Sequence, residues 1–205
     1  MTRYVVTGTD TDVGKTVIAA GLAAGLGAAY WKPVQAGLDG DTDAVTVRRL
    51  APPVRVLPEA YRLTTPCSPH AAAEADGVRI EDDALLLPAE DGPLIVEGAG
   101  GLLVPIRTDL LSAQLFARWG LPIIIVARTR LGTINHTLLT VQVARAHGLH
   151  VAGIVFSGAA EPVAQEAIAA LAEAPMLGRL PFLDPLDAAS LSAAMRDHVR
   201  LDLLA

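Results

Sequence analysis

The sequence contains a single cysteine, only two lysines and few aromatic residues, and it has no run of basic side chains. With Cys67 alone no intrachain disulfide can form, and this composition suits a reducing compartment. We interpret Cys67 as a small filler side chain rather than a nucleophile. A net charge of −6 without a Lys/Arg cluster argues against nucleic acid as a partner.

Long apolar segments are also missing. The uncharged stretch at 16–31 is short for a membrane-spanning helix, and Asp10 and Asp12 precede it where a signal peptide would carry basic residues. Within it, Ile18 and Leu22 recur at helical spacing. The stretch therefore predicts a helix packed on a sheet, and we expect a cytoplasmic protein that does not bind membranes.

Short apolar segments alternate with helical patterns along the whole chain. This alternation predicts an α/β fold with a doubly wound, mainly parallel sheet flanked by helices. With 205 residues, 52% of them hydrophobic, and no repeat or linker, we expect a single domain over residues 1–205. We expect strands near 4–7, 28–34, 61, 93–97, 121–127, 151–156 and 176–180. We expect helices that begin at 16 and at 188, one that runs through 47–50, and others over 70–75, 80–87, 112–119, about 133–147 and 162–173.

Residues 4–17 combine a short apolar strand, a Gly-bounded loop and a Gly-Lys-Thr that begins a helix. Such a loop directs backbone N–H groups and a helix N-terminus at one small volume, which is how phosphates are held. Lys15 is expected to reach the β- and γ-phosphates, and the Thr16 hydroxyl to bind Mg²⁺. Five residues separate Gly8 from the Gly-Lys instead of the usual four, with Thr9 in place of the first glycine. The pattern predicts a P-loop NTPase-like fold.

Polar side chains also follow the other predicted strands, at the edge where parallel sheets bind ligands. Glu97 ends an apolar strand before a run of glycines, which is typical of a second anchor for Mg²⁺ in P-loop proteins. The strand at 28–34 is expected to end at Lys32-Pro33, and the compact charge of Lys32 suits a transferring phosphoryl group or a developing oxyanion. We interpret His70 and His136 as structural residues, since no Ser-His-Asp order or Cys/His metal spacing accompanies them.

Besides the loop at 6–16 with its extra residue, five further sequence blocks are distinctive: 32–37, 66–70, 96–102, 131–136 and 177–181. Together they resemble the dethiobiotin synthetase family, in family order and over nearly the whole chain. The resemblance implies closure of the ureido ring in biotin synthesis, from 7,8-diaminopelargonic acid, CO₂ and MgATP. One amine becomes a carbamate, which takes the γ-phosphoryl group of ATP. The second amine then attacks the carbamic-phosphoric anhydride, and ADP and phosphate are released.

The resemblance also implies roles for individual residues. Lys15, Lys32 and Thr11 would be catalytic. Thr16, Asp43 and Glu97 would hold Mg²⁺, with Asp41 as a competitor for the place of Asp43. ATP would contact Asp12, Val13, Gly14, Lys15, Thr16, Val17, Asp43, Glu97, Gly98, Ala99, Gly100, Ser157, Gly158, Pro181, Phe182 and Leu183.

The substrate is expected to bind beside Ala36. In the family its carboxylate docks at a helix N-terminus of the other subunit, which here would be formed by Gly132, Thr133, Ile134 and Asn135. The resemblance therefore implies a homodimer with active sites at the interface.

Two positions depart from the family pattern. Ala36 stands where Ser or Thr usually offers a hydroxyl to the substrate. Ser157 and Gly158 stand where many members carry the Asn that reads adenine. We therefore expect a relaxed choice of nucleotide, with GTP or CTP competing with ATP.

Two alternatives remain open. One is the related amidation domain of cobyric or cobyrinic acid synthases, although 205 residues do not accommodate their glutaminase domain. The other is a ParA/MinD-like ATPase switch that dimerises on DNA or membrane. Such switches carry an extra lysine early in the loop, where this chain has Thr9 and Asp10.

Overall fold

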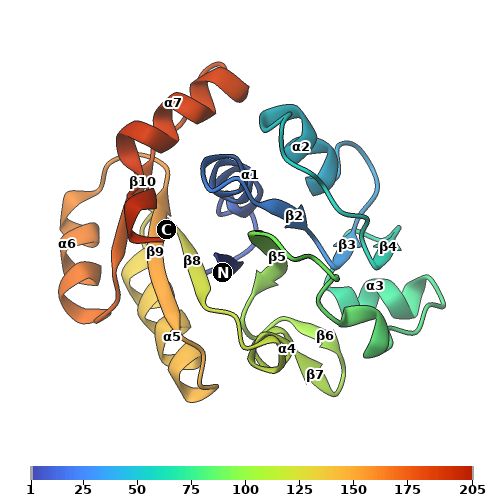
Figure 1. The fold of residues 1–205 in the computed structure, drawn as a ribbon. Helices are drawn as coiled ribbons and strands as arrows, with labels where there is room; N and C mark the ends of the chain where they lie inside the picture. The colour runs from blue at the N-terminus through green and yellow to red at the C-terminus, as the bar shows by residue number, and fades with distance from the viewer. Residues whose placement is uncertain (1, 205) are drawn as a thin grey trace.

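The computed structural model describes residues 2–204 and is organised around a six-stranded sheet (Figure 1). The strand order is β10-β9-β8-β1-β5-β2, and every pairing is parallel. Helices cross between these strands, as parallel pairing requires, and the α/β prediction is confirmed. The strands are β1 (Arg3–Gly8), β2 (Ala29–Trp31), β5 (Leu94–Gly101), β8 (Ile123–Arg128), β9 (Val151–Ser157) and β10 (Met176–Leu180).

Helices cover both faces of this sheet. One face carries α1 (Lys15–Gly25), α2 (Asp43–Leu50) and α7 (Ala188–His198), and the other carries α3 (Pro69–Ala75), α4 (Ser112–Trp119), α5 (Thr133–Ala146) and α6 (Pro162–Leu171) (Figure 1). Neighbouring strand residues pack on opposite faces: Val6 and Ile95 join the first layer, and Val5 and Val96 the second. Burial on both faces explains why the strands are continuous apolar runs. In residues 2–204 no helix has the length and apolar character to cross a membrane.

The strand predicted over 28–34, with its end at Lys32-Pro33, is confirmed only in part, because β2 ends at Trp31 and a second strand begins at Val34. Only β2 belongs to the main sheet; β3 (Val34–Ala36) pairs instead with β4 (Tyr61–Leu63), the short strand expected near Tyr61. Pro33 lies at the break and has no N–H to donate to a sheet ladder. A further hairpin, β6 (Pro105–Arg107) with β7 (Leu110–Leu111), was not predicted.

Two other predicted boundaries are wrong. Strand β5 does not end at Glu97 but continues to Gly101, which pairs with Gly8. A Cβ at Gly101 would lie 3.0 Å from the Gly8 carbonyl oxygen, so glycine lets the two strands stay close. The helix expected over 80–87 is only a 3₁₀ turn, η1 (Asp83–Leu85), since a helix is disfavoured just before Pro88. A second 3₁₀ turn, η2 (Leu201–Leu203), follows α7.

Candidate active site

Strand β1 runs directly into the nucleotide loop, and α1 begins at Lys15. Gly14 is the N-cap of α1 with φ +90°, where a Cβ is strained, and an added Cβ would lie 2.6 Å from Ser157 Oγ. Only glycine suits this position. The Lys15 ammonium donates to the backbone oxygen of Asp10 at 2.9 Å and so bridges the loop. Burial lowers the pKa of Lys15, while the nearby Glu97 acts in the opposite direction.

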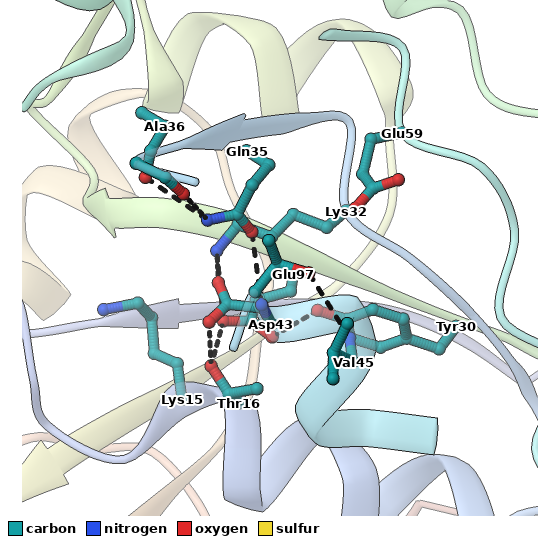
Figure 2. A network of polar contacts seen from close by, with 12 residues as sticks. Lys15, Thr16, Tyr30, Lys32, Gln35, Ala36, Asp43, Val45, Glu59 and Glu97 are labelled. Atoms are coloured by element: carbon teal, nitrogen blue, oxygen red, sulfur yellow. Dashed lines mark hydrogen bonds and ion pairs between the residues drawn. The ribbon is translucent and has the colours of Figure 1, made fainter. Parts of the chain in front are cut away.

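Three elements bring two carboxylates and a hydroxyl together, as Figure 2 shows. Thr16 Oγ1, in the first turn of α1, lies 3.0 Å from Asp43 Oδ1 and 2.9 Å from Glu97 Oε1. A hydroxyl has one proton, so it can donate to only one of the two carboxylates at a time. Lys32 contacts both acids: its ammonium pairs with Asp43 Oδ2 and lies 3.4 Å from Glu97 Oε1. The charges of this group are therefore closely coupled.

Lys32 is buried and remains charged. Burial alone would lower its pKa, but Glu97 and Asp43 together raise the pKa of Lys32 above its ordinary value. Glu97 is itself only 1% exposed. Because a buried charge is stable only with a close partner, each of these groups depends on the others.

The oxygen atoms of this group fit Mg²⁺. Asp43, Glu97 and Thr16 offer the hard oxygen ligands that the ion prefers, and Mg²⁺ is usually bound by one or two carboxylates together with nucleotide phosphates. Among the described residues, no cluster of three or more His, Cys, Asp or Glu side chains could hold a metal alone. With two carboxylates and one hydroxyl, the site suits a Mg²⁺ ion that also binds nucleotide phosphates. Asp41, the alternative ligand, is exposed.

Two buried residues that the sequence analysis missed support the carboxylates. The Tyr30 hydroxyl donates to Glu97 Oε2 at 2.7 Å. Gln35 Oε1 accepts from the backbone N–H of Asp43 at 3.3 Å and so fixes the start of α2. Tyr30 lies two residues before Lys32, and that spacing on a strand is a signal that both side chains share one face.

A cavity of about 830 Å³ is bordered by the charged residues Lys15, Lys32, Asp43 and Glu97, together with Thr16 and Gln35. The segment from Pro66 to Pro69 also lines it, and Cys67, which the sequence predicts to be a filler side chain, is exposed there. The cavity brings together most of the predicted loop, metal and catalytic residues: Thr11, Asp12, Gly14, Lys15, Thr16, Val17, Lys32, Ala36, Asp43, Glu97, Ala99 and Gly100.

The other residues predicted to contact ATP lie outside this cavity. Val13 is buried in the core beside α1, and Gly98 packs against the Phe116 ring. Ser157 lies against the loop at Gly14. Gly158, which follows it, accepts a hydrogen bond from Arg179 at 2.8 Å. In the segment 181–183 the ring of Phe182 is 77% exposed between half-buried Pro181 and Leu183.

The four residues predicted to bind the substrate carboxylate form the start of α5. Gly132 is the N-cap with φ +93° and provides no side-chain cap. The N–H of Thr133 donates to the Arg130 oxygen at 3.1 Å, so the N–H groups of Ile134 and Asn135 are the ones that could bind an anion. Asn135 is exposed, Ile134 is half-buried, and Thr133 is buried with its hydroxyl 3.4 Å from that of Thr137. None of the four lines the cavity of its own chain.

Strand β1, the loop with Lys15 and Thr16, and the carboxylate on neighbouring β5 define a P-loop nucleotide-binding protein. The family model described as "AAA domain" matches residues 2–190. A ParA family ATPase from Chlorobium tepidum shares the fold, with a TM-score of 0.58 at 12% identity, covering 98% of this chain and 92% of that one.

Two curated proteins are much more similar in sequence. The ATP-dependent dethiobiotin synthetase BioD of Rhodopseudomonas palustris (strain BisB18) is 56% identical over 196 residues, 95% of this chain and 94% of that protein. The protein of the same name from Nitrobacter hamburgensis is 53% identical over 203 residues, 98% and 96% of the two chains. The chain therefore belongs to the dethiobiotin synthetase family, which confirms the resemblance of the six sequence blocks.

Proposed function

We propose that this chain closes the ureido ring of dethiobiotin from 7,8-diaminopelargonic acid and CO₂, with MgATP as the second substrate. One observation carries the proposal: the only two lysines of the sequence lie with two carboxylates and a hydroxyl on one cavity of about 830 Å³. The similar proteins are named dethiobiotin synthetases, which supports the choice of reaction. The two lysines at the cavity provide the fixed positive charge that this reaction needs.

The reaction joins groups that repel one another. One amine of the substrate attacks CO₂ and loses a proton, giving a carbamate. A carbamate oxygen attacks the γ-phosphorus and ADP leaves. The second amine then attacks the carbamate carbon, loses a proton and expels phosphate, so that the ring closes. The carbamate and the γ-phosphate are both anionic, so their approach needs positioned positive charge more than a strong base.

The residues of the cavity have separate roles in this scheme. Lys15 holds the β- and γ-phosphates from the loop, and Lys32 stabilises the charge that develops between carbamate and phosphorus. Thr11, which also lines the cavity, faces the transferred group. A Mg²⁺ ion held by Thr16, Asp43 and Glu97 would neutralise part of the phosphate charge.

We further propose a homodimer in which the partner subunit binds the substrate carboxylate. The start of α5, at Gly132 to Asn135, offers backbone N–H groups but lies outside the cavity of its own chain. Two exposed leucines lie at this helix, Leu131 just before α5 and Leu139 on it. A third exposed leucine, Leu103, borders the same hollow of about 440 Å³ as Leu139. This apolar surface supports contact with a second copy.

Phosphate release from MgATP, measured with and without the diamine and bicarbonate, tests the proposed function. We expect release to require both compounds and dethiobiotin to accumulate in equal amount. Release that the diamine leaves unchanged would contradict the proposal. The similarity to the ParA family ATPase concerns the fold alone, so a parallel experiment adds DNA. Stimulation of phosphate release by DNA would favour the alternative of a ParA/MinD-like ATPase switch.

A further inference from the structure

Glu97 has two oxygen atoms with different partners. Oε1 lies 2.9 Å from Thr16 Oγ1 and 3.4 Å from the Lys32 ammonium, on the side of the cavity. Oε2 accepts a hydrogen bond from the Tyr30 hydroxyl at 2.7 Å, on the side of the core (Figure 2). Because the terminal torsion of a glutamate is broad, nothing intrinsic to Glu97 fixes the orientation of its carboxylate plane relative to the cavity. Its partners determine this.

The sheet register holds Tyr30 where this hydrogen bond can form. Tyr30 pairs with Ile95 in the β2·β5 ladder, and Glu97 lies two residues further along β5 on the same face. The Tyr30 ring is fully buried among the core residues beside α1. Its position is therefore set by packing and not by the ligand.

The Tyr30 hydroxyl is a permanent donor. A tyrosine phenol carries its proton at neutral pH, so the Tyr30 hydroxyl donates to Glu97 Oε2 at 2.7 Å. Tyr30 does not line the cavity, so a nucleotide or substrate bound there does not touch it. Any effect of its hydroxyl on the reaction has to pass through Glu97.

We propose that Tyr30 is a positioning residue of the magnesium site, and that its hydroxyl holds Glu97 so that Oε1 faces the metal. The inference rests on the proposed function, because it takes Glu97 to be a Mg²⁺ ligand. The carboxylate of Asp43 is held differently: its oxygens contact Thr16 and Lys32, which both line the cavity, and Gln35 accepts a hydrogen bond from its backbone N–H. Groups that orient metal ligands typically change metal affinity by about 10–100-fold when they are removed.

The substitution Tyr30→Phe removes only the hydroxyl and tests the inference. Tyr4→Phe is the matched control, since the Tyr4 hydroxyl donates to the backbone oxygen of Leu204 at 2.9 Å and not to a residue of the site. Calorimetric titration of Mg²⁺ into the ADP-bound protein measures metal affinity, and titration of ADP in EDTA measures nucleotide affinity alone. For Tyr30→Phe we expect metal affinity to fall about 10–100-fold, with metal-free ADP binding unchanged. Tyr4→Phe should match the wild type in both.

Unchanged Mg²⁺ affinity in Tyr30→Phe would overturn the inference. An equal loss of Mg²⁺ affinity in Tyr4→Phe, or a parallel loss of metal-free ADP binding in Tyr30→Phe, would also overturn it. If Tyr30→Phe does not fold, 3-fluorotyrosine placed at position 30 keeps both volume and donor. Its ¹⁹F resonance should then shift when Mg²⁺ is added to the ADP-bound protein, and a constant resonance would overturn the inference. A wild-type protein that binds Mg²⁺ with ADP but releases no diamine-dependent phosphate would contradict the proposed function and leave Tyr30 in its role.

Discussion

Ser157 lies directly against Gly14 of the nucleotide loop, close enough that a Cβ on Gly14 would come within 2.6 Å of the serine oxygen. The end of β9 therefore meets the start of α1, beside the expected place of the phosphates. Gly158 follows with φ +130°, and a Cβ there would lie 2.6 Å from Thr129 Oγ1. Two small residues thus occupy the positions at which, according to the family resemblance, many members carry the Asn that is expected to read adenine.

The first prediction concerns nucleotide choice. Serine lacks the paired donor and acceptor with which an asparagine amide recognises adenine, so we expect GTP and CTP to compete with ATP. The variant Ser157→Asn should raise the preference for ATP by about tenfold or more. The ratios of kcat/KM for the three nucleotides measure it. A wild-type preference for ATP of about a thousandfold would contradict this prediction.

The second prediction concerns Lys32. Its ammonium is held by Asp43 and Glu97 at the cavity, so Lys32→Ala should remove charge that matters most in the transition state. We expect kcat to fall by about 10²–10³-fold while the Kd of ATP changes little. Lys15→Ala is the comparison and should weaken ATP binding itself. If Lys32→Ala instead abolished ATP binding, Lys32 would belong to the nucleotide site.

The third prediction concerns the partner subunit. Asn135→Asp places a negative charge at the start of α5 and should repel the substrate carboxylate, raising KM with little change in ATP affinity. Mixing this variant with Lys32→Ala should restore about a quarter of the wild-type rate, because half of the random dimers are mixed and each holds one intact site. Rates are measured with the diamine below KM. If activity did not recover after the subunits have exchanged, Asn135 and Lys32 would belong to the active site of the same chain.

The local motifs of the site could be predicted from the sequence. Lys15 and Thr16 follow a strand and open a helix, and Glu97 interrupts an apolar strand; each pattern lies within a few residues. The choice between Asp41 and Asp43 depends on the path of a loop, and it is the structure that brings Asp43 to 3.0 Å from Thr16. Tyr30 was missed because its contact with Glu97, 67 residues away, depends on the pairing of β2 with β5.

The same distinction holds for the fold. Long elements such as α5 and β8 were predicted within a few residues, because β8 is a continuous apolar run and α5 spans 14 residues. The hairpin of β6 and β7 was not, because strands of three and two residues are too short to show a period. The break at Pro33 was read as the end of one strand, whereas β3 continues into a separate sheet because its partner β4 lies far along the chain.

The most direct test of the proposed chemistry follows oxygen from CO₂ in a single turnover with ¹⁸O-labelled CO₂, the diamine and MgATP. If a carbamate oxygen attacks the γ-phosphorus, the released phosphate carries one labelled oxygen and the ureido carbonyl keeps the other. Mass spectrometry of both products measures the label. Phosphate without ¹⁸O, formed together with labelled dethiobiotin, would contradict the mixed anhydride on which the roles of Lys15 and Lys32 depend.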